Sequence, residues 1–169
     1  MPIVTLPPSA MLDEHAKKTV LRKIPHALYV CGVREGEELN AFTASWVMQA
    51  SFKPPLVTVC IRQDSRSHAM VLASKVFALS FLATGQKTIA EHFFQSVKRV
   101  GNRLGDIEFY VGETGCPIIQ EALGYVECQV VGSLTYGDHT VFVGEVIAAG
   151  VHQDQEPLLL RETGWNYGG

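Results

Sequence analysis

One stretch decides how this chain folds: Asn40-Ala-Phe-Thr-Ala-Ser-Trp-Val-Met-Gln-Ala-Ser-Phe-Lys-Pro-Pro-Leu56. It has the pattern of a strand rich in small polar side chains, then a tight polar turn, then a Pro-Pro corner that opens into an apolar strand. A strand that served only the core would carry more branched aliphatic side chains. Small residues let a ligand approach the backbone, where exposed N–H groups bind heteroatoms. The stretch therefore predicts a site for a flat, partly polar ligand, with polar side chains between aromatic ones: Thr43, Ser45, Gln49 and Ser51 between Phe42, Trp46 and Phe52.

Length and composition indicate one globular domain with its own hydrophobic core. The chain has 169 residues, of which 47% are hydrophobic and 18% are charged. The formal net charge of -3 argues against a general nucleic-acid-binding protein, which needs a basic face to release counterions from phosphates. We predict a single domain over residues 1–169, with an arm and a helix in residues 1–25 and a tail in residues 157–169.

The sequence lacks the patterns of secreted, membrane and metal-binding proteins. Acidic Asp13 and Glu14 come early, no basic segment precedes an apolar one, and no apolar run is long enough for a bilayer. The histidines form no HExxH motif, and the cysteines form no CxxC pair. We therefore expect a soluble, cytoplasmic protein with reduced thiols and no metal. The four cysteines are Cys31, Cys60, Cys116 and Cys128.

The predicted elements are mainly β with a few short helices. Many short strands without alternating βαβ units favour a barrel or a sandwich. After an irregular arm over residues 1–8, we expect Ser9 to cap a helix over residues 10–23. A capping box at residues 88–91 predicts a helix over residues 89–97. The other expected elements are strands over residues 27–33, 41–49, 56–61, 76–82, 107–111, 116–119, 122–132 and 140–151, a helix over 68–73 and a basic loop over 98–105.

Several common catalytic motifs are missing from the sequence. No G-x-G-x-x-G follows a predicted strand, so a Rossmann dinucleotide fold is unexpected. Gly85-Gln-Lys-Thr88 resembles the end of a P-loop, but Gln86 separates the glycine from the lysine and the upstream glycine is missing. No G-x-S-x-G elbow supports a serine hydrolase.

A polar segment, Asp64-Ser-Arg-Ser-His68, precedes the helix expected over residues 68–73. Two hydroxyls, a guanidinium and a helix N-terminus together make an anion-binding site. The alternative is an ordinary capped turn in contact with solvent. The segment alone does not decide between the two.

On a regular strand, the residues of the deciding stretch divide between two faces. Thr43, Ser45, Val47 and Gln49 would share one face, and Phe42, Ala44, Trp46 and Met48 the other. Either the polar face meets a ligand, or one face packs and the other meets solvent. Likewise, Trp46 and Phe52 either wall a ring or belong to the core.

Two further places have a functional and a structural interpretation. The loop over residues 81–86 ends a buried strand and either closes against a ring or begins the next helix. His139 follows the tight turn at residues 136–138, where it either meets a cofactor or completes the turn.

Four segments, in order, resemble the flavin reductase-like family of FMN-binding split-barrel proteins. They are residues 40–56, residues 64–68, Val76-Phe-Ala-Leu-Ser-Phe81 and Gly137-Asp-His-Thr-Val-Phe-Val-Gly-Glu-Val146. The likeness extends over about residues 26–151. It implies a Greek-key split β-barrel that works as a homodimer, with flavin in a groove near the subunit interface. It also implies an NAD(P)H-dependent flavin oxidoreductase, in which hydride passes from NADH or NADPH to FMN, or to FAD, and onward to an acceptor such as a partner monooxygenase.

The resemblance assigns roles to residues by position. The flavin ring and ribityl chain would meet residues of the deciding stretch, the phosphate would meet the polar segment, and His139 would lie near flavin and nicotinamide as the active-site side chain. No catalytic acid or base is required, since the hydride chemistry belongs to the cofactor. The implied cofactor-binding residues are Asn40, Thr43, Ala44, Ser45, Trp46, Gln49, Ala50, Ser51, Cys60, Ser65, Arg66, Ser67 and His68.

Two other functions are also compatible with the sequence. One is an electron-transfer protein with tightly bound FMN, flavoredoxin-like, or a ferric reductase, with little direct NAD(P)H activity. The other is a dimeric β-barrel without a ligand. Two segments depart from the family pattern: residues 98–104, and the aromatic, glycine-rich end of the tail. There, Trp165 and Tyr167 would cover the cofactor, join the dimer contact or lie in a disordered tail.

Overall fold

The computed structural model describes residues 11–169 and consists of strands with four short helices. The predicted arm over residues 1–8 and the proposed cap at Ser9 lie outside the described residues. The helices are α1 Glu14–Leu21, α2 Arg66–Ser74, α3 Lys87–His92 and α4 Leu160–Thr163. The strands are β1 Tyr29–Glu35, β2 Glu38–Ala44, β3 Val47–Ser51, β4 Leu56–Arg62, β5 Val76–Phe81, β6 Arg99–Val100, β7 Arg103–Leu104, β8 Ile107–Val111, β9 Pro117–Ile119, β10 Gly124–Thr135 and β11 His139–Val151.

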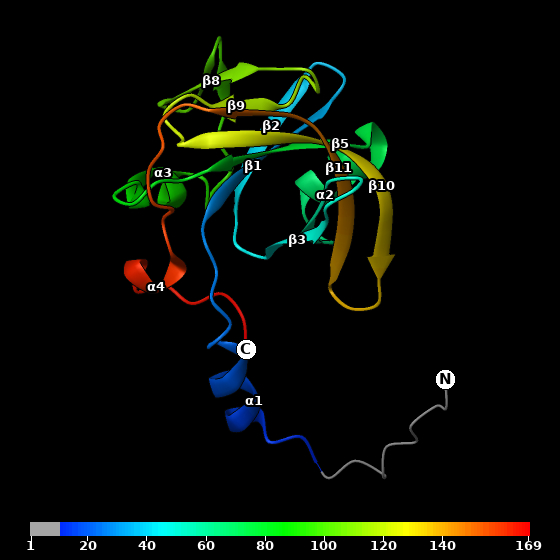
Figure 1. Ribbon diagram of the computed structural model, residues 1–169, viewed down its shortest axis with the longest axis vertical. Coiled ribbons are helices and arrows are strands. Elements are labelled where there is room, and N and C mark those ends of the chain that lie inside the picture. The colour runs from blue at the N-terminus through cyan, green and yellow to red at the C-terminus, as the bar shows by residue number, and fades with distance from the viewer. Residues whose placement is uncertain (1–10) are drawn as a thin grey trace.

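Seven strands form one antiparallel sheet in the order β2-β1-β5-β10-β11-β4-β3. The order is not sequential: β1 pairs with β2 and β5, and the long β10–β11 hairpin lies between β5 and β4 (Figure 1). Consequently, β2 and β3 are consecutive in the chain but lie at opposite edges of the sheet.

This strand order requires the sheet to curl. Six inter-strand spacings would separate the edges of a flat sheet by about 29 Å. Yet Ser45 and Trp46 alone join Ala44 at the end of β2 to Val47 at the start of β3, and an extended chain crosses at most about 11 Å there. The edges must therefore approach each other, which gives the predicted split barrel. The mainly β fold is confirmed.

The interior of the barrel is apolar and is bounded by α2. Large side chains with no more than 2% exposure fill it, from α2 and from strands distant in the sequence: Val33, Val59, Ile61, Met70, Phe77, Leu79 and Phe142. The opposite face of β1 is also buried, against α3 and the smaller β6-β7-β8-β9 sheet. Gly32 is needed here, because a Cβ at this position would lie 2.0 Å from the backbone oxygen of Pro117. Both faces of the central strands are thus buried, as their unbroken apolar runs predict.

Three predicted boundaries were wrong for local reasons. The strand predicted over residues 41–49 is two strands with a bend between them. The first helix begins at Glu14, since Asp13 is its N-cap and accepts from Ala16 N–H at 2.9 Å. The basic loop over residues 98–105 contains the β6–β7 hairpin, which turns through Gly101 at a φ of 61°.

The predicted capping box at Thr88 was also wrong. Thr88 lies inside α3, whose N-cap is Gln86, and no side chain caps that end. The Gln86 side chain instead accepts from Ala83 N–H at 2.8 Å and donates to the Glu121 carbonyl at 2.6 Å. Gln86 therefore fixes the loop after β5, and the helix ends at His92 rather than at residue 97. Within residues 11–169, no helix has the length and apolar character that crossing a bilayer requires.

Candidate functional site

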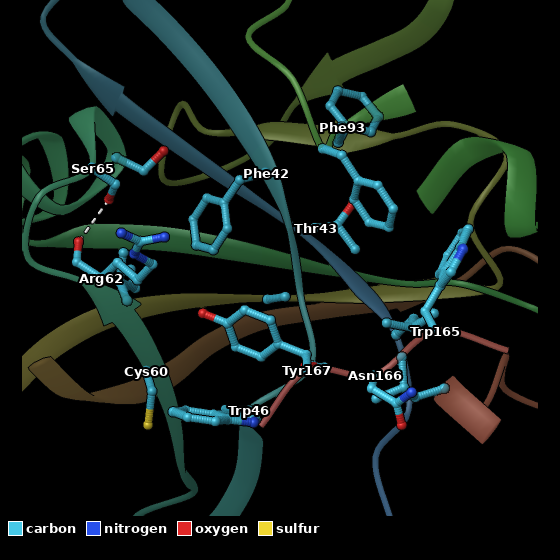
Figure 2. Close-up of a pocket in the computed structure, with 17 residues that line it drawn as sticks. Phe42, Thr43, Trp46, Cys60, Arg62, Ser65, Phe93, Trp165, Asn166 and Tyr167 are labelled. Carbon is cyan, nitrogen blue, oxygen red and sulfur yellow. Dashed lines mark hydrogen bonds between the residues drawn. The ribbon is translucent and has the colours of Figure 1, made fainter. Parts of the chain in front are cut away.

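A cavity of about 590 Å³ lies beside the bend between β2 and β3. This volume is in the usual range for sites of small molecules and cofactors. Two sides can be distinguished. The strand side comes from the sheet and the start of α2, and the other side comes from the residues after α3, from α4 and from the residues that follow α4 (Figure 2). The lining residues are Leu28, Phe42, Thr43, Ala44, Ser45, Trp46, Cys60, Ile61, Arg62, Ser65, Ser67, Phe93, Phe94, Leu160, Trp165, Asn166 and Tyr167.

The bend brings five consecutive residues, 42–46, to the cavity. The alternation expected for one regular strand does not hold, because the chain leaves the β1 ladder after Ala44 and enters the β4 ladder at Val47. Among the described residues, neither Ser45 nor Trp46 donates its backbone N–H to another protein group. The bend thus offers the small residues and free N–H groups that the sequence predicted for a flat, partly polar ligand.

The aromatic walls come from separate elements. Trp46 at the bend lies with its ring centroid 4.7 Å from that of His139 and 5.1 Å from that of Tyr167. Phe42 and Tyr167 both project into the space between the walls in Figure 2. By contrast, Phe52, the other aromatic residue expected at a ring, is 91% exposed and lies outside the cavity.

The polar part of the cavity lies where β4 leads into α2. Ser65 caps α2, accepting from His68 N–H at 3.2 Å and donating to the Arg62 carbonyl at 2.8 Å. Ser67 accepts from the Asn40 side chain at 3.0 Å. The Arg62 guanidinium is paired with Asp64 at 2.6 Å. Together with the first backbone N–H groups of α2, these residues form an arrangement suited to a phosphate.

The structure does not bring Arg66 and His68 to this cavity. Arg66 is paired with Glu38 at 2.7 Å. His68 is buried, with its Nε2 2.7 Å from the Thr140 hydroxyl and its ring against Phe142. Burial lowers the pKa of the His68 imidazole below its ordinary value. The direction of each side chain follows from the helical geometry of α2, which the polar segment alone does not reveal.

The remaining predicted ligands divide by location. Cys60 lines the cavity, and burial raises the pKa of its thiol. Thr43 lines it as well, with its hydroxyl donating to the Ala90 carbonyl at 2.6 Å. Asn40 acts through Ser67 rather than lining the cavity. On β3, Gln49 and Ala50 are exposed and Ser51 is partly exposed, outside the cavity of this chain.

His139 begins β11, directly opposite Arg62 on β4. Its Nδ1 is 2.6 Å from an Asp138 oxygen, and its Nε2 is 2.8 Å from the Tyr167 hydroxyl. The hydrogen bond from His139 is the main cause of the lowered pKa of the Asp138 carboxyl. His139 does not itself line the cavity, but the predicted turn at residues 136–138 holds its side chain against two residues that do, Trp46 and Tyr167.

Sequence reasoning missed part of the lining. Arg62 carried a weak signal, as a basic residue at the end of an apolar strand. Phe93, Phe94 and Leu160 carried none, because their apolar side chains resemble ordinary core residues in the sequence. Trp165 and Tyr167, in the aromatic end of the tail, do line the cavity, in agreement with one of the three roles that the sequence leaves open for them.

The residues present fit a flavin. Aromatic and aliphatic side chains form walls, the N–H groups of residues 45 and 46 have no partner among the described residues and would be available to the heteroatoms of a ring, and Arg62, Ser65 and Ser67 would supply donors for a phosphate. No group of three or more metal-binding side chains occurs within the described part of the chain.

Comparisons with known proteins agree with this geometry. The flavin reductase like domain matches residues 21–168. The NADH-dependent FAD reductase of Streptomyces globisporus is 33% identical over 163 residues, 94% of this chain and 88% of that protein. The solved NADH:FAD oxidoreductase of S. globisporus C-1027 has a TM-score of 0.76 at 31% identity and covers 90% of this chain and 93% of that chain. The flavin reductase component of a bacterial two-component tryptophan halogenase has a TM-score of 0.75 at 28% identity, with 87% and 92% covered.

A segment similar to this chain also occurs within a much longer protein. Putative diflavin flavoprotein A 3 of Synechocystis is 33% identical over 138 residues, which are 80% of this chain but 23% of that protein. The chain thus spans about a quarter of this relative and most of the NADH-dependent FAD reductase. The resemblance to the flavin reductase-like family is confirmed.

Proposed function

The chain belongs to the flavin reductase-like family, and on this premise we propose that it is an NAD(P)H-dependent flavin oxidoreductase. One observation carries the proposal: the cavity at the β2–β3 bend joins apolar walls, free backbone N–H groups and a phosphate-type polar end in one site. A bound flavin supplies the hydride chemistry, and the protein supplies binding and orientation.

The residues of the site have distinct tasks in this proposal. Trp46 and Phe42 hold the ring and exclude water, and the N–H groups of Ser45 and Trp46 stabilise negative charge that develops on it. Arg62, Ser65 and Ser67 bind the phosphate and take no part in the hydride-transfer step. The side chain of His139, beside Trp46, orients the reacting rings, because hydride transfer depends on close approach and alignment.

Several assignments remain predictions. FMN is the proposed ligand and FAD the alternative, with NADH or NADPH as the co-substrate. For Arg66 and His68, the present geometry favours indirect roles through α2. Gln49, Ala50 and Ser51 would meet flavin only if it extends over the β3 edge or if a second copy of the chain adjoins that edge.

We also propose a homodimer. Large apolar side chains are exposed on β3, directly after it and on the β10–β11 hairpin, in support of a partner surface there: Met48, Phe52, Val131, Leu134, Tyr136 and Ile147. Sedimentation velocity tests this proposal, and a monomer at micromolar concentration would contradict it. A monooxygenase or a similar flavin-dependent enzyme is the proposed recipient of reduced flavin, and the four free cysteines support a reducing compartment such as the cytoplasm.

One observation supports the alternative function of an electron-transfer protein: a segment similar to this chain occurs in the much longer diflavin flavoprotein. The deciding experiment mixes FMN-loaded protein with NADH, and separately with NADPH, without oxygen, and follows the absorbance of oxidised flavin. Rapid bleaching by one nucleotide is expected for a reductase and identifies its preference. Bound flavin that stays oxidised with both would favour the carrier, and a protein that binds no flavin would overturn both.

A further inference from the structure

The residues after α4 lie over the cavity rather than in solvent. We define residues 165–167 as the cover segment, which comprises Trp165, Asn166 and Tyr167 and lines the cavity (Figure 2). It begins after Gly164, whose φ of 79° turns the chain out of α4. The cover segment therefore faces the strand side across the space that a ring ligand would use.

At its first residue, the cover segment is held by α3 and by the residues that follow this helix. The Trp165 ring packs edge-on against Phe94 at 4.7 Å between centroids, and the Lys87 ammonium lies 4.8 Å from the Trp165 ring. Lys87 also donates to the Thr163 carbonyl at 2.8 Å. These contacts fix the start of the segment and leave its far end to be held by other groups.

At its far end, the cover segment is held by His139. The Asp138 carboxylate only accepts, so His139 carries its proton on Nδ1. In the neutral ring, Nε2 is then an acceptor, and the Tyr167 hydroxyl donates to it at 2.8 Å. Both ring nitrogens are thus engaged, and the His139 side chain is only 14% exposed.

The contacts beyond Tyr167 are weak. Gly168 accepts one hydrogen bond, at 3.2 Å from Arg22, the C-cap of α1, and α1 has no buried residue. Tyr167 itself remains 45% exposed. Segments with few buried contacts open at low free energy, whereas strands in a core open only with global unfolding. We therefore expect the Tyr167 end of the cover segment to be the part of the cavity wall that opens most readily.

Resting on the function proposed above, we propose that residues 165–167 are a displaceable cover in which the Tyr167 hydroxyl occupies His139 until a planar heteroaromatic ring takes its place. The ligand class is a flavin or nicotinamide ring. Such a ring reaches His139 only when Tyr167 withdraws, because Tyr167 and Trp46 lie against it. The strand side then binds the ring, and the cover sets how readily it enters.

The main test is Tyr167→Phe, which removes the hydroxyl and keeps the ring. One neutral hydrogen bond corresponds to about a two- to tenfold change in an equilibrium constant. We therefore expect Y167F to bind its ring ligand about two- to tenfold more tightly than the unaltered chain, as measured by fluorescence titration of the flavin-free protein. FMN and NAD⁺ are titrated separately. The ligand whose affinity changes in Y167F is the one whose ring competes with Tyr167.

Two controls accompany this variant. Tyr110→Phe makes the same change at a tyrosine whose hydroxyl lies 2.6 Å from a histidine nitrogen, Nε2 of His152, and which does not line the cavity, and it is expected to leave both affinities unchanged. A chain ending at Gly164 lacks the cover altogether and is expected to bind the competing ligand at least as tightly as Y167F. Circular dichroism of each variant confirms that the barrel is folded.

A second measurement follows the contact directly. In the flavin-free protein, the His139 ring nitrogens are observed by NMR, and the Nε2 signal is expected to move in Y167F and on addition of the competing ligand to the unaltered chain. Unchanged or weaker binding of both ligands by Y167F would overturn the proposal of a displaceable cover but not the proposed function. No binding of flavin by the unaltered chain would overturn the proposed function and the cover with it.

Discussion

The two sides of the cavity differ in how firmly the rest of the molecule holds them. The strand side, residues 42–46 and 60–67, rests on the barrel core through Ala44 and Ile61, which are 6% and 2% exposed. The cover segment is held by aromatic contacts of Trp165 with Phe94 and of Tyr167 with Trp46 and His139, by one cation–π contact, and by a hydrogen bond at each end. Orientation of a reacting ring requires a rigid support, while entry and exit of a ligand require a part that opens, and this protein separates the two tasks.

The largest effect is expected from a change in the core beneath the strand side. Leu79→Ala removes a fully buried side chain of β5 and is expected to lower the free energy of unfolding by about 2–5 kcal/mol. Leu72→Ala, at a residue of α2 that is 42% exposed, is the matched control and should cost much less. Urea denaturation of both variants measures the difference, and equal losses would contradict a firmly held strand side.

The second effect concerns the polar end of the strand side. Arg62 lines the cavity, whereas Arg66 is paired with Glu38 outside it. We expect Arg62→Ala to weaken FMN binding by roughly tenfold, which is at the low end for a hydrogen bond to a charged group because Arg62 is half-exposed. Arg66→Ala should weaken FMN binding less. Riboflavin lacks the phosphate, so its affinity should respond little to either change. A larger loss in R66A than in R62A would instead favour the assignment made from the sequence.

A third change compares the two tryptophans across the cavity. Trp46→Leu removes a wall of the strand side and is expected to weaken flavin binding about two- to tenfold, the usual value of an aromatic contact. Trp165→Leu makes the same change in the cover segment and should leave the affinity equal or higher. Fluorescence titration with FMN distinguishes them. Equal weakening in the two variants would mean that both sides hold the ring.

The smallest expected effect is the pH dependence of stability that arises from His68, which is buried behind the polar part of the cavity. The folded protein holds the pKa of His68 below its ordinary value of 6.5, so the unfolded chain binds a proton there more readily. The free energy of unfolding therefore includes the contribution of neutral His68 above about pH 6.5, and this contribution decreases as the pH falls below 6.5. The pKa of His26 is shifted in the same direction, so part of the loss will remain in any His68 variant.

Thermal unfolding at several pH values tests this. His68→Gln is expected to reduce the loss of stability on acidification, and His15→Gln, at an exposed residue of α1, is expected to leave it unchanged. Identical pH dependence in H68Q and the unaltered chain would assign the acid sensitivity to other groups.

The sequence itself determined the mainly β fold, most strand positions and the importance of residues 40–56. These features follow from local physics: apolar runs between turn residues form buried strands, and a Pro-Pro corner ends one strand and begins the next. The tight turn before His139 was also visible, because Tyr136-Gly-Asp138 separates two apolar runs.

Only the tertiary structure decided which of the singled-out residues meet. Closure of the barrel produced the bend at Ser45 and Trp46, a consequence of strand order that no local pattern contains. The direction of α2 turned His68 into the core and brought Ser65 and Ser67 to the cavity. The contact between Tyr167 and His139, 28 positions apart, depends on how the chain returns after β11. Local propensity fixes the elements, while side-chain direction and long-range contacts depend on packing between elements that are distant in sequence.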